Sequence, residues 1–180
     1  MPAILLISLL VLAPSLQAMP SMGHAEVACP ATPVPLPSGL EGWARKQPVR
    51  AGDTARTATT LPLGSGVTAT LLPTPQITYS VRAKKPVGPA SSGGMFAFAV
   101  PARGRYRVVL GSAAWIDVLR DTTLGTSATA LPIPSVAHAH GPDCTGLRKM
   151  VDFDLMPGRH LLQVVGNSTA VLPMMVVWMP

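Results

Sequence analysis

The sequence predicts an all-β protein, an antiparallel β-sandwich or jelly-roll-like barrel of about eight short strands. Two observations lead to this fold class. Apolar and polar residues alternate along most of the chain beyond residue 57, which is the period of a half-buried strand. The alternating segments are short and are separated by turns rich in Pro and Gly, of which the chain has 20 and 16. Such regular punctuation is typical of sandwiches and barrels.

The first four strands are expected as two pairs. Residues 67–72 and 77–81 flank a Pro-Thr-Pro turn, and residues 95–100 and 105–110 flank the turn at 101–104. Short alternating segments on either side of a tight turn predict hairpins, so we expect the second pair to be hydrogen-bonded to each other. The side chains expected to face the core are Phe96, Phe98, Val100, Tyr106, Val108 and Leu110.

The remaining strands are expected at 115–119, 149–155, 160–165 and 170–179. The Met-Pro-Gly-Arg sequence at 156–159 is a turn, and it predicts a second hairpin between the strands that flank it. Almost no segment has the helical period, so the fold is expected to contain sheets alone.

The N-terminus predicts an exported protein. Residues 3–13 form an uncharged apolar run that suits a signal peptide, with cleavage after Ala25 or, alternatively, after Ala18. The run is shorter than the roughly 20 apolar residues that span a bilayer, so no transmembrane segment is expected after processing. We therefore divide the chain into a signal peptide (1–25), a Pro-rich arm (26–56) and a β-sandwich domain (57–180), located in the periplasm or secreted.

Charge and cysteine content narrow the function classes. The net charge is +6, but the Arg and Lys residues are scattered, aromatic residues are few, and no nucleic-acid-binding motif occurs. A small molecule or a cell-envelope component is a better partner for an exported basic protein. The only two cysteines, Cys29 and Cys144, predict a disulfide that stabilises the fold by on the order of 4 kcal/mol.

The chemically richest segment is the long connection at 120–148, and connections of this length are usually functional. His138 and His140 would point the same way in an extended chain, and paired imidazoles suit Fe, Cu or Zn. The carboxylates of Asp117 and Asp152 are candidate further ligands. Additional candidates for ligand binding by this loop are Asp143, Arg148 and Lys149.

Each of these residues also has a purely structural interpretation. The two His can be loop residues whose ring N–H groups bond backbone carbonyls. Asp117 lies in an apolar strand, so it must face solvent or find a partner, and Arg148 or Lys149 could serve as readily as a metal. Asp152 and Asp154 alternate with apolar residues, which predicts that both face outward and are solvated. No nucleophile elbow, phosphate-binding loop or metalloprotease motif occurs in the sequence.

Six runs of the sequence resemble a family of small exported bacterial proteins commonly named homogentisate 1,2-dioxygenase: 42–43, 93–98, 104–111, 115–118, 138–144 and 148–153. The resemblance covers most of the chain after the leader, and it implies an enzyme that opens an aromatic ring with ferrous iron and oxygen. That dioxygenase holds iron with two His and one Glu. Because Glu26 and Glu41 both lie in the arm, the resemblance implies His138, His140 and an Asp here. The pair of strands at 95–110 is also similar to pre-peptidase-type β-sandwich modules, which are binding or accessory domains.

Two hypotheses follow from the sequence. The favoured one is a non-enzymatic exported sandwich that binds a ligand, an envelope partner or a metal through residues 120–148. The alternative is a metal-dependent dioxygenase that uses His138, His140 and an Asp, which requires three ligands around one metal ion and open positions for substrate and oxygen.

Overall fold

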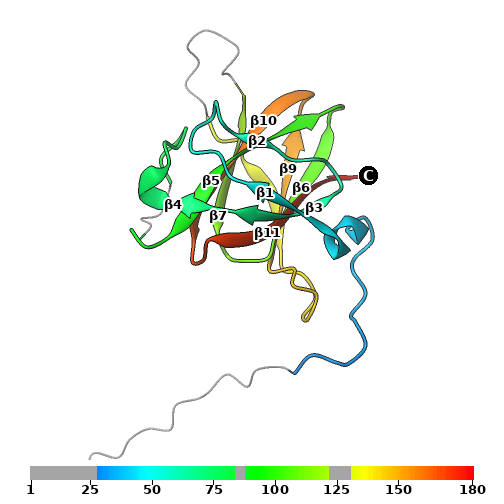
Figure 1. The fold of residues 1–180 in the computed structure, drawn as a ribbon. Helices are drawn as coiled ribbons and strands as arrows, with labels where there is room; N and C mark the ends of the chain where they lie inside the picture. Colours follow the sequence, from blue (N-terminus) through cyan, green and yellow to red (C-terminus); the bar gives the residue numbers. More distant parts are fainter. Residues whose placement is uncertain (1–27, 84–87, 122–130) are drawn as a thin grey trace, which may run out of the picture.

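The computed structural model describes residues 28–83, 88–121 and 131–180 (Figure 1). The predicted leader and both of its possible cleavage positions lie outside these residues. The elements in chain order are η1 (Glu41–Ala44), β1 (Lys46–Arg50), β2 (Thr59–Thr60), β3 (Gly66–Thr70), β4 (Leu72–Pro73), η2 (Thr74–Gln76), β5 (Ser92–Val100), β6 (Gly104–Leu110), β7 (Trp115–Arg120), β8 (Ser135–Ala139), β9 (Lys149–Leu155), β10 (Gly158–Asn167) and β11 (Val171–Met179).

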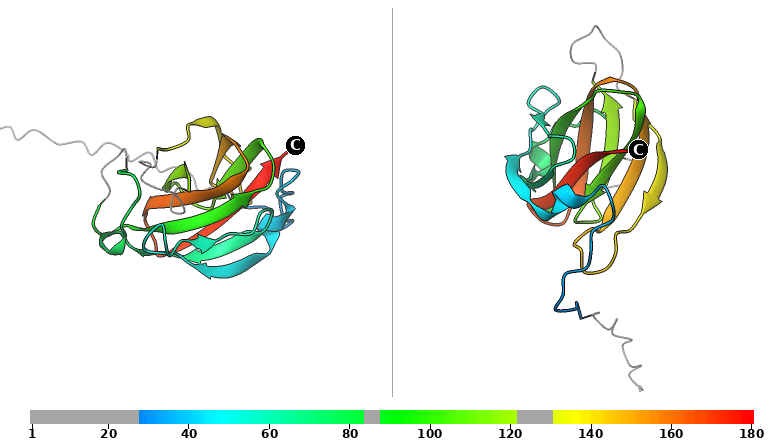
Figure 2. Two further views of the ribbon diagram at one scale, coloured as in Figure 1. Left: turned by 90° about the horizontal axis from the view of Figure 1, so that it is seen from above. Right: turned by 90° about the vertical axis from the view of Figure 1, so that its right-hand side faces the viewer.

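The strands form two packed sheets, so the predicted all-β sandwich is confirmed (Figure 2). The six-stranded sheet has the order β1-β3-β11-β6-β9-β8, and the five-stranded sheet has the order β2-β5-β10-β7 with β4 also paired to β5. Pairing is antiparallel except between β1 and β3 and between β2 and β5, which are parallel. The sheets are therefore mixed, whereas the sequence predicted antiparallel pairing throughout.

Most consecutive strands lie in different sheets, and this corrects both predicted hairpins. β5 pairs with β10, and β6 pairs with β9 and β11, so the turn between β5 and β6 crosses from one sheet to the other. The turn between β9 and β10 crosses in the same way. A tight turn between two alternating segments is equally compatible with a hairpin within one sheet and with a crossing from one sheet to the other. In both arrangements the two strands run antiparallel and few residues separate them.

Three apolar layers account for the burial pattern. The inward faces of both sheets meet in the main core, which contains all six side chains predicted to face it. A second cluster lies on the outer face of the six-stranded sheet, where Leu40 and Trp43 of the arm cover Val109 and Met175. A third lies on the outer face of the five-stranded sheet. Both sheets are thus covered on their outer faces as well, which explains why β5 is buried on both sides.

Residues 77–81 are not a strand, although their alternation predicts one. Ile77, Tyr79 and Val81 pack on the outer face of the five-stranded sheet beside Leu161. The Gln163 side chain replaces a strand partner here: its Nε2 donates to the Val81 carbonyl (2.8 Å) and its Oε1 accepts from the Val81 N–H (3.3 Å). The alternation at 77–81 therefore marks a packed apolar face, and not a strand paired within a sheet.

Four short strands were not predicted. β2 and β4 have two residues each, too few to show a period. β1 contains Pro48 and lies within the predicted arm, yet it pairs with β3 at the edge of the six-stranded sheet. β8 is exposed at all five positions, so it carries no alternation of apolar and polar residues. In the described part of the chain, no helix is long and apolar enough to cross a membrane.

Candidate ligand-binding cleft

The candidate site lies at an open margin of the sandwich, between the edge strands of the two sheets. β7 is the edge of the five-stranded sheet and β8 is the edge of the six-stranded sheet, where it is seen in yellow in Figure 2. Before entering β8, the chain runs along β7: the Ile133 N–H donates to the Val118 carbonyl (2.7 Å), and Pro132 bridges Leu119. This segment joins the two sheets and forms one wall of the cleft.

The cleft between these edges has a volume of about 170 Å³. Its wall is largely apolar and aromatic, and its polar side chains come from three strands. The lining residues are Trp115, Ile116, Asp117, Pro132, Ile133, Pro134, Ser135, His138, Lys149, Val151 and Phe153. Small-molecule sites in proteins share this composition, with an apolar wall and a few placed polar groups.

Lys149 is the cation of the cleft. It pairs in register with Leu110, whose side chain faces the core, so Lys149 also points between the sheets. Its Nζ donates to the Ala114 carbonyl (2.9 Å) and lies 5.6 Å from the centroid of the Trp115 ring. An ammonium group can only donate hydrogen bonds, so Lys149 adds a positive charge and donor groups to the lining of the cleft.

His138 stands where the cleft meets a second, more open hollow of about 320 Å³. A ring nitrogen of His138, Nε2, lies 3.2 Å from the Ser135 hydroxyl. The hollow is bordered by Ala113, His138, Ala139, His140, Arg148 and Lys149. Since His138 and Lys149 border both spaces, the hollow is the mouth of the cleft, and the side chains able to carry charge there are all basic.

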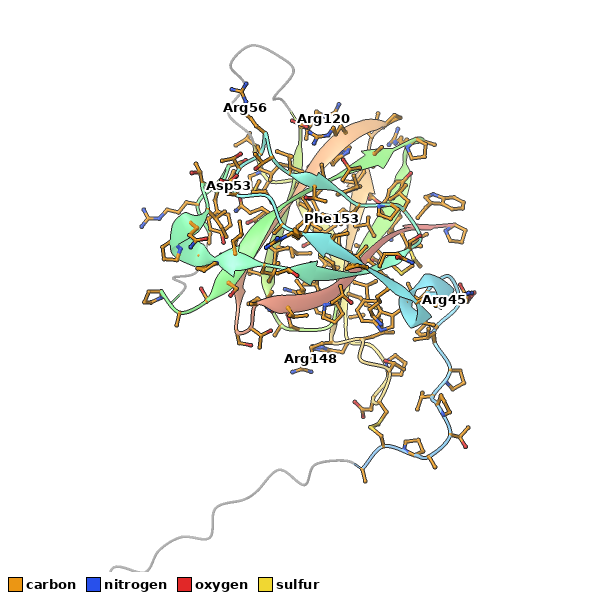
Figure 3. All side chains as sticks on the ribbon, viewed as in Figure 1. Arg45, Asp53, Arg56, Arg120, Arg148 and Phe153 are labelled. Carbon is orange, nitrogen blue, oxygen red and sulfur yellow. A yellow bond between two sulfur atoms is a disulfide. The ribbon has the colours of Figure 1, made fainter. Side chains whose placement is uncertain are left out.

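The loop at 140–148 is fixed to the N-terminal arm. The predicted disulfide is confirmed: Cys29 and Cys144 are bonded, with their Cα atoms 5.5 Å apart (Figure 3). The Trp43 indole donates from Nε1 to the Thr145 carbonyl (3.1 Å). Cys144 has φ of 64°, which is rare for a residue other than Gly. The loop thus holds an uncommon backbone conformation that the bridge and the arm maintain.

The loop residues predicted to bind a ligand are dispersed. His140 Nδ1 lies 2.9 Å from the Arg148 carbonyl, a contact that closes the base of the loop. Asp143 is exposed and lines a further hollow of about 270 Å³, which shares His140 and Arg148 with the mouth of the cleft. Lys149 lines the cleft, and Arg148 borders its mouth.

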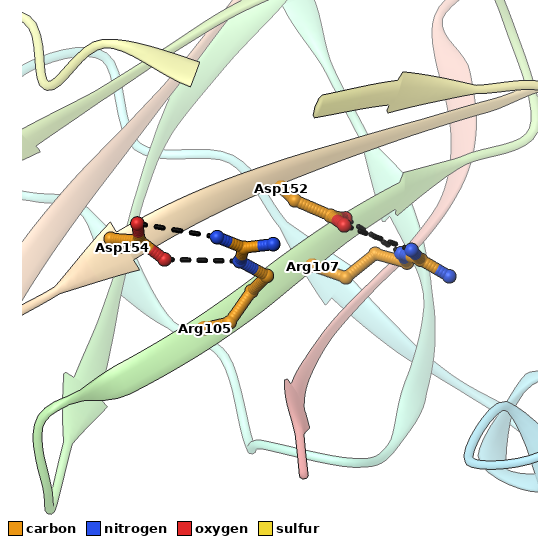
Figure 4. A network of polar contacts seen from close by, with 4 residues as sticks. All are labelled: Arg105, Arg107, Asp152 and Asp154. Atoms are coloured by element: carbon orange, nitrogen blue, oxygen red, sulfur yellow. Dashed lines mark hydrogen bonds and ion pairs between the residues drawn. The ribbon is translucent and has the colours of Figure 1, made fainter. Parts of the chain in front are cut away.

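The acidic candidates have other partners. Asp117 is buried, and its Oδ2 accepts from Trp115 Nε1 (3.1 Å) and Gln163 Nε2 (3.3 Å). Asp152 was expected to be solvated but is buried, because Arg107 covers it with two hydrogen bonds, from Nε (2.7 Å) and Nη2 (2.9 Å) (Figure 4). This pairing raises the pKa of the Arg107 guanidinium. Asp154 is exposed as expected and pairs with Arg105.

Within residues 28–83, 88–121 and 131–180, no three or more His, Cys, Asp or Glu side chains lie close enough to share a metal ion. His160 lies in the main core, stacked on Phe98 with 5.6 Å between ring centroids. Burial lowers the pKa of its imidazole, and a ring nitrogen of His160, Nε2, has no hydrogen-bond partner among the described residues.

Comparison with known proteins finds no matching family model and no matching curated sequence. The site therefore has to be interpreted from its own geometry. Sequence reasoning missed Ser135, Ile133 and Phe153 as lining residues. These three residues meet only because the segment before β8 runs along β7 and β8 pairs with β9, and no local pattern in the sequence indicates that course.

Proposed function

We propose that this protein is an exported, non-enzymatic binding protein that holds a small organic ligand in the cleft between β7 and β8. The apolar leader and the Cys29–Cys144 bridge support export, because disulfides persist in oxidising compartments. The observation that carries the binding function is the cleft itself, a space with apolar and aromatic walls and four polar side chains, of which Lys149 and His138 also border a basic mouth.

The size and polarity of the cleft define its ligand. Its volume of about 170 Å³ is close to that of an engineered cavity, about 150 Å³, that accommodates one benzene molecule. The ligand therefore has a compact apolar body. It also carries a polar group, because the Ser135 hydroxyl and the His138 ring border the same space and can donate or accept hydrogen bonds. A metal-dependent dioxygenase finds no support of this kind in the described residues, where His140 Nδ1 contacts the Arg148 carbonyl and Asp152 pairs with Arg107.

Trp115 lines the cleft, so its fluorescence reports on occupancy. A Trp43→Phe/Trp178→Phe variant keeps Trp115 as the sole indole and can be titrated with a panel of small alcohols, amides and carboxylic acids. We expect a saturable signal from members of the panel. The Ile133→Phe substitution fills the cleft and should weaken the affinity for the ligand by at least about tenfold. Leu131→Phe, at a position 74% exposed, should not weaken it.

Two results would contradict the proposal. One is a panel in which no compound perturbs Trp115 while the variant remains folded by circular dichroism. The other is binding that Ile133→Phe and Leu131→Phe affect equally, because a ligand in the cleft must be displaced by the first substitution alone.

A further inference from the structure

A second candidate site lies at the opposite end of the six-stranded sheet, around Trp178. A hollow of about 590 Å³ opens there between the turn before β6, the end of β9 and the end of β11. Its lining residues are Arg103, Gly104, Arg105, Asp154, Leu155, Met156, Trp178, Met179 and Pro180. It shares no residue with the cleft between β7 and β8 or with the mouth of that cleft.

Trp178 forms an exposed aromatic platform in this hollow. The preceding inward-facing residues of β11, Met174 and Val176, are fully buried, whereas Trp178 at the open end of the sandwich is 52% exposed. Its indole lies against Gly104, where a Cβ atom would come within 2.8 Å of Trp178 Nε1. The absence of a side chain at Gly104 therefore allows the edge of the indole that carries Nε1 to lie close to the turn before β6.

The polar groups beside the platform are two guanidinium groups and one carboxylate. Arg105 donates from Nε to Asp154 Oδ1 (3.0 Å) and from Nη2 to Oδ2 (3.4 Å), which leaves its Nη1 group outside this pair (Figure 4). Arg103 is exposed and enters no hydrogen bond or ion pair among the described residues. Hydrogen-bond donors and an acceptor thus line the same hollow as the indole.

We propose that this hollow binds an acidic saccharide, with a sugar ring stacked on Trp178 and a carboxylate held by Arg103. The C–H face of a pyranose suits an exposed indole, and a guanidinium fork matches a carboxylate in two parallel hydrogen bonds. Asp154 accepts from sugar hydroxyls beside Arg105. A nucleotide would also stack on Trp178, and adenosine monophosphate is therefore the competing ligand in the experiment. The net charge of +6 favours a polyanionic ligand over a neutral one.

The test is calorimetric titration of the oxidised protein at about 0.15 M salt with an oligogalacturonate, its methyl-esterified form and adenosine monophosphate. The ester keeps the sugar but removes the charge. We expect the acid to bind and the ester to bind at least about tenfold more weakly. Trp178→Ala and Arg103→Gln should each weaken binding of the acid by a similar factor. Trp178→Phe, which keeps an aromatic face, should retain most of the affinity.

Arg56→Gln is the matched control, because it removes one exposed positive charge at a distance from the hollow (Figure 3). If it weakens binding as much as Arg103→Gln, the attraction is unspecific and the proposal is wrong. It is equally wrong if the ester binds as well as the acid, if adenosine monophosphate binds more tightly than either, or if none of the three binds.

Discussion

Two Arg–Asp pairs, two residues apart along each of the same two strands and both on the outer face, provide an internal comparison of burial. The Arg107–Asp152 side chains are 20% and 7% exposed, whereas those of Arg105 and Asp154 are 50% and 60% exposed. Asp152→Asn and Asp154→Asn remove one negative charge each without changing side-chain volume. We expect the first to destabilise the protein and the second to leave its stability unchanged within error.

The expected loss of stability depends on the hydrogen bonds and the hydration that each Arg side chain can regain after the substitution. Breaking a buried ion pair from one side costs about 3 to 5 kcal/mol. Arg107 is partly exposed, and Asn can still accept from its Nε, so the expected cost is that of one charge-assisted hydrogen bond, about 1.5 to 3 kcal/mol. This corresponds to a fall in Tm of about 3 to 12 °C for a domain of this size. The freed Arg105 guanidinium is already hydrated.

Urea unfolding followed by circular dichroism measures both variants. A double-mutant cycle with Arg107→Ala should give a coupling energy of at least about 1 kcal/mol between residues 107 and 152, and the cycle between 105 and 154 should give none. Equal costs for the two Asn variants, or no coupling between 107 and 152, would refute the argument that burial decides the strength of these pairs.

Three further perturbations test other parts of the fold. Because burial lowers the pKa of His160, the unfolded chain takes up its proton at higher pH than the folded protein. Stability should therefore be complete above about pH 6.5 and fall below it by up to about 1.4 kcal/mol per pH unit, and His160→Leu should reduce this slope in urea titrations at several pH values. Gly141→Ala places a Cβ against the backbone of the 140–148 loop and should cost about 1 to 3 kcal/mol, whereas Gly88→Ala, which meets open space, should cost nothing measurable. Replacing Cys29 and Cys144 by Ser opens a loop with a sequence separation of 115 and should cost about 2 to 4 kcal/mol, at or below the chain-entropy value, because the exposed arm can fray locally; unchanged stability would contradict this.

The local alternation of apolar and polar residues predicted strand positions wherever one face of a strand meets the core. Seven of the eight predicted strands overlap β3, β5, β6, β7, β9, β10 and β11. The faces assigned to the segments at 95–110 agree with the main core. The pattern failed at 77–81, because an alternating segment can satisfy its backbone with a side chain such as Gln163. It also failed at β8, where all residues are exposed.

The candidate site was predictable only in part. His138, Lys149 and Asp117 were selected from the sequence for their chemistry, and all three border the cleft. Asp152 was selected for the same reason, but it lies under Arg107 on the outer face of the sheet. Whether these residues line the same cleft depends on the pairing of β9 with β6 and β8. The spacing of residues within a single segment does not predict that pairing.

The sequence by itself determined the all-β class, most strand positions, the inward faces and the Cys29–Cys144 bridge, because period, turn residues and cysteine pairing are local or compositional properties. The tertiary structure alone decided that consecutive strands cross between sheets, that both outer faces are covered, and that β7 and β8 border a common cleft. Pairing between distant strands is set by the packing of the whole core, where alternatives that look the same locally bury different surfaces.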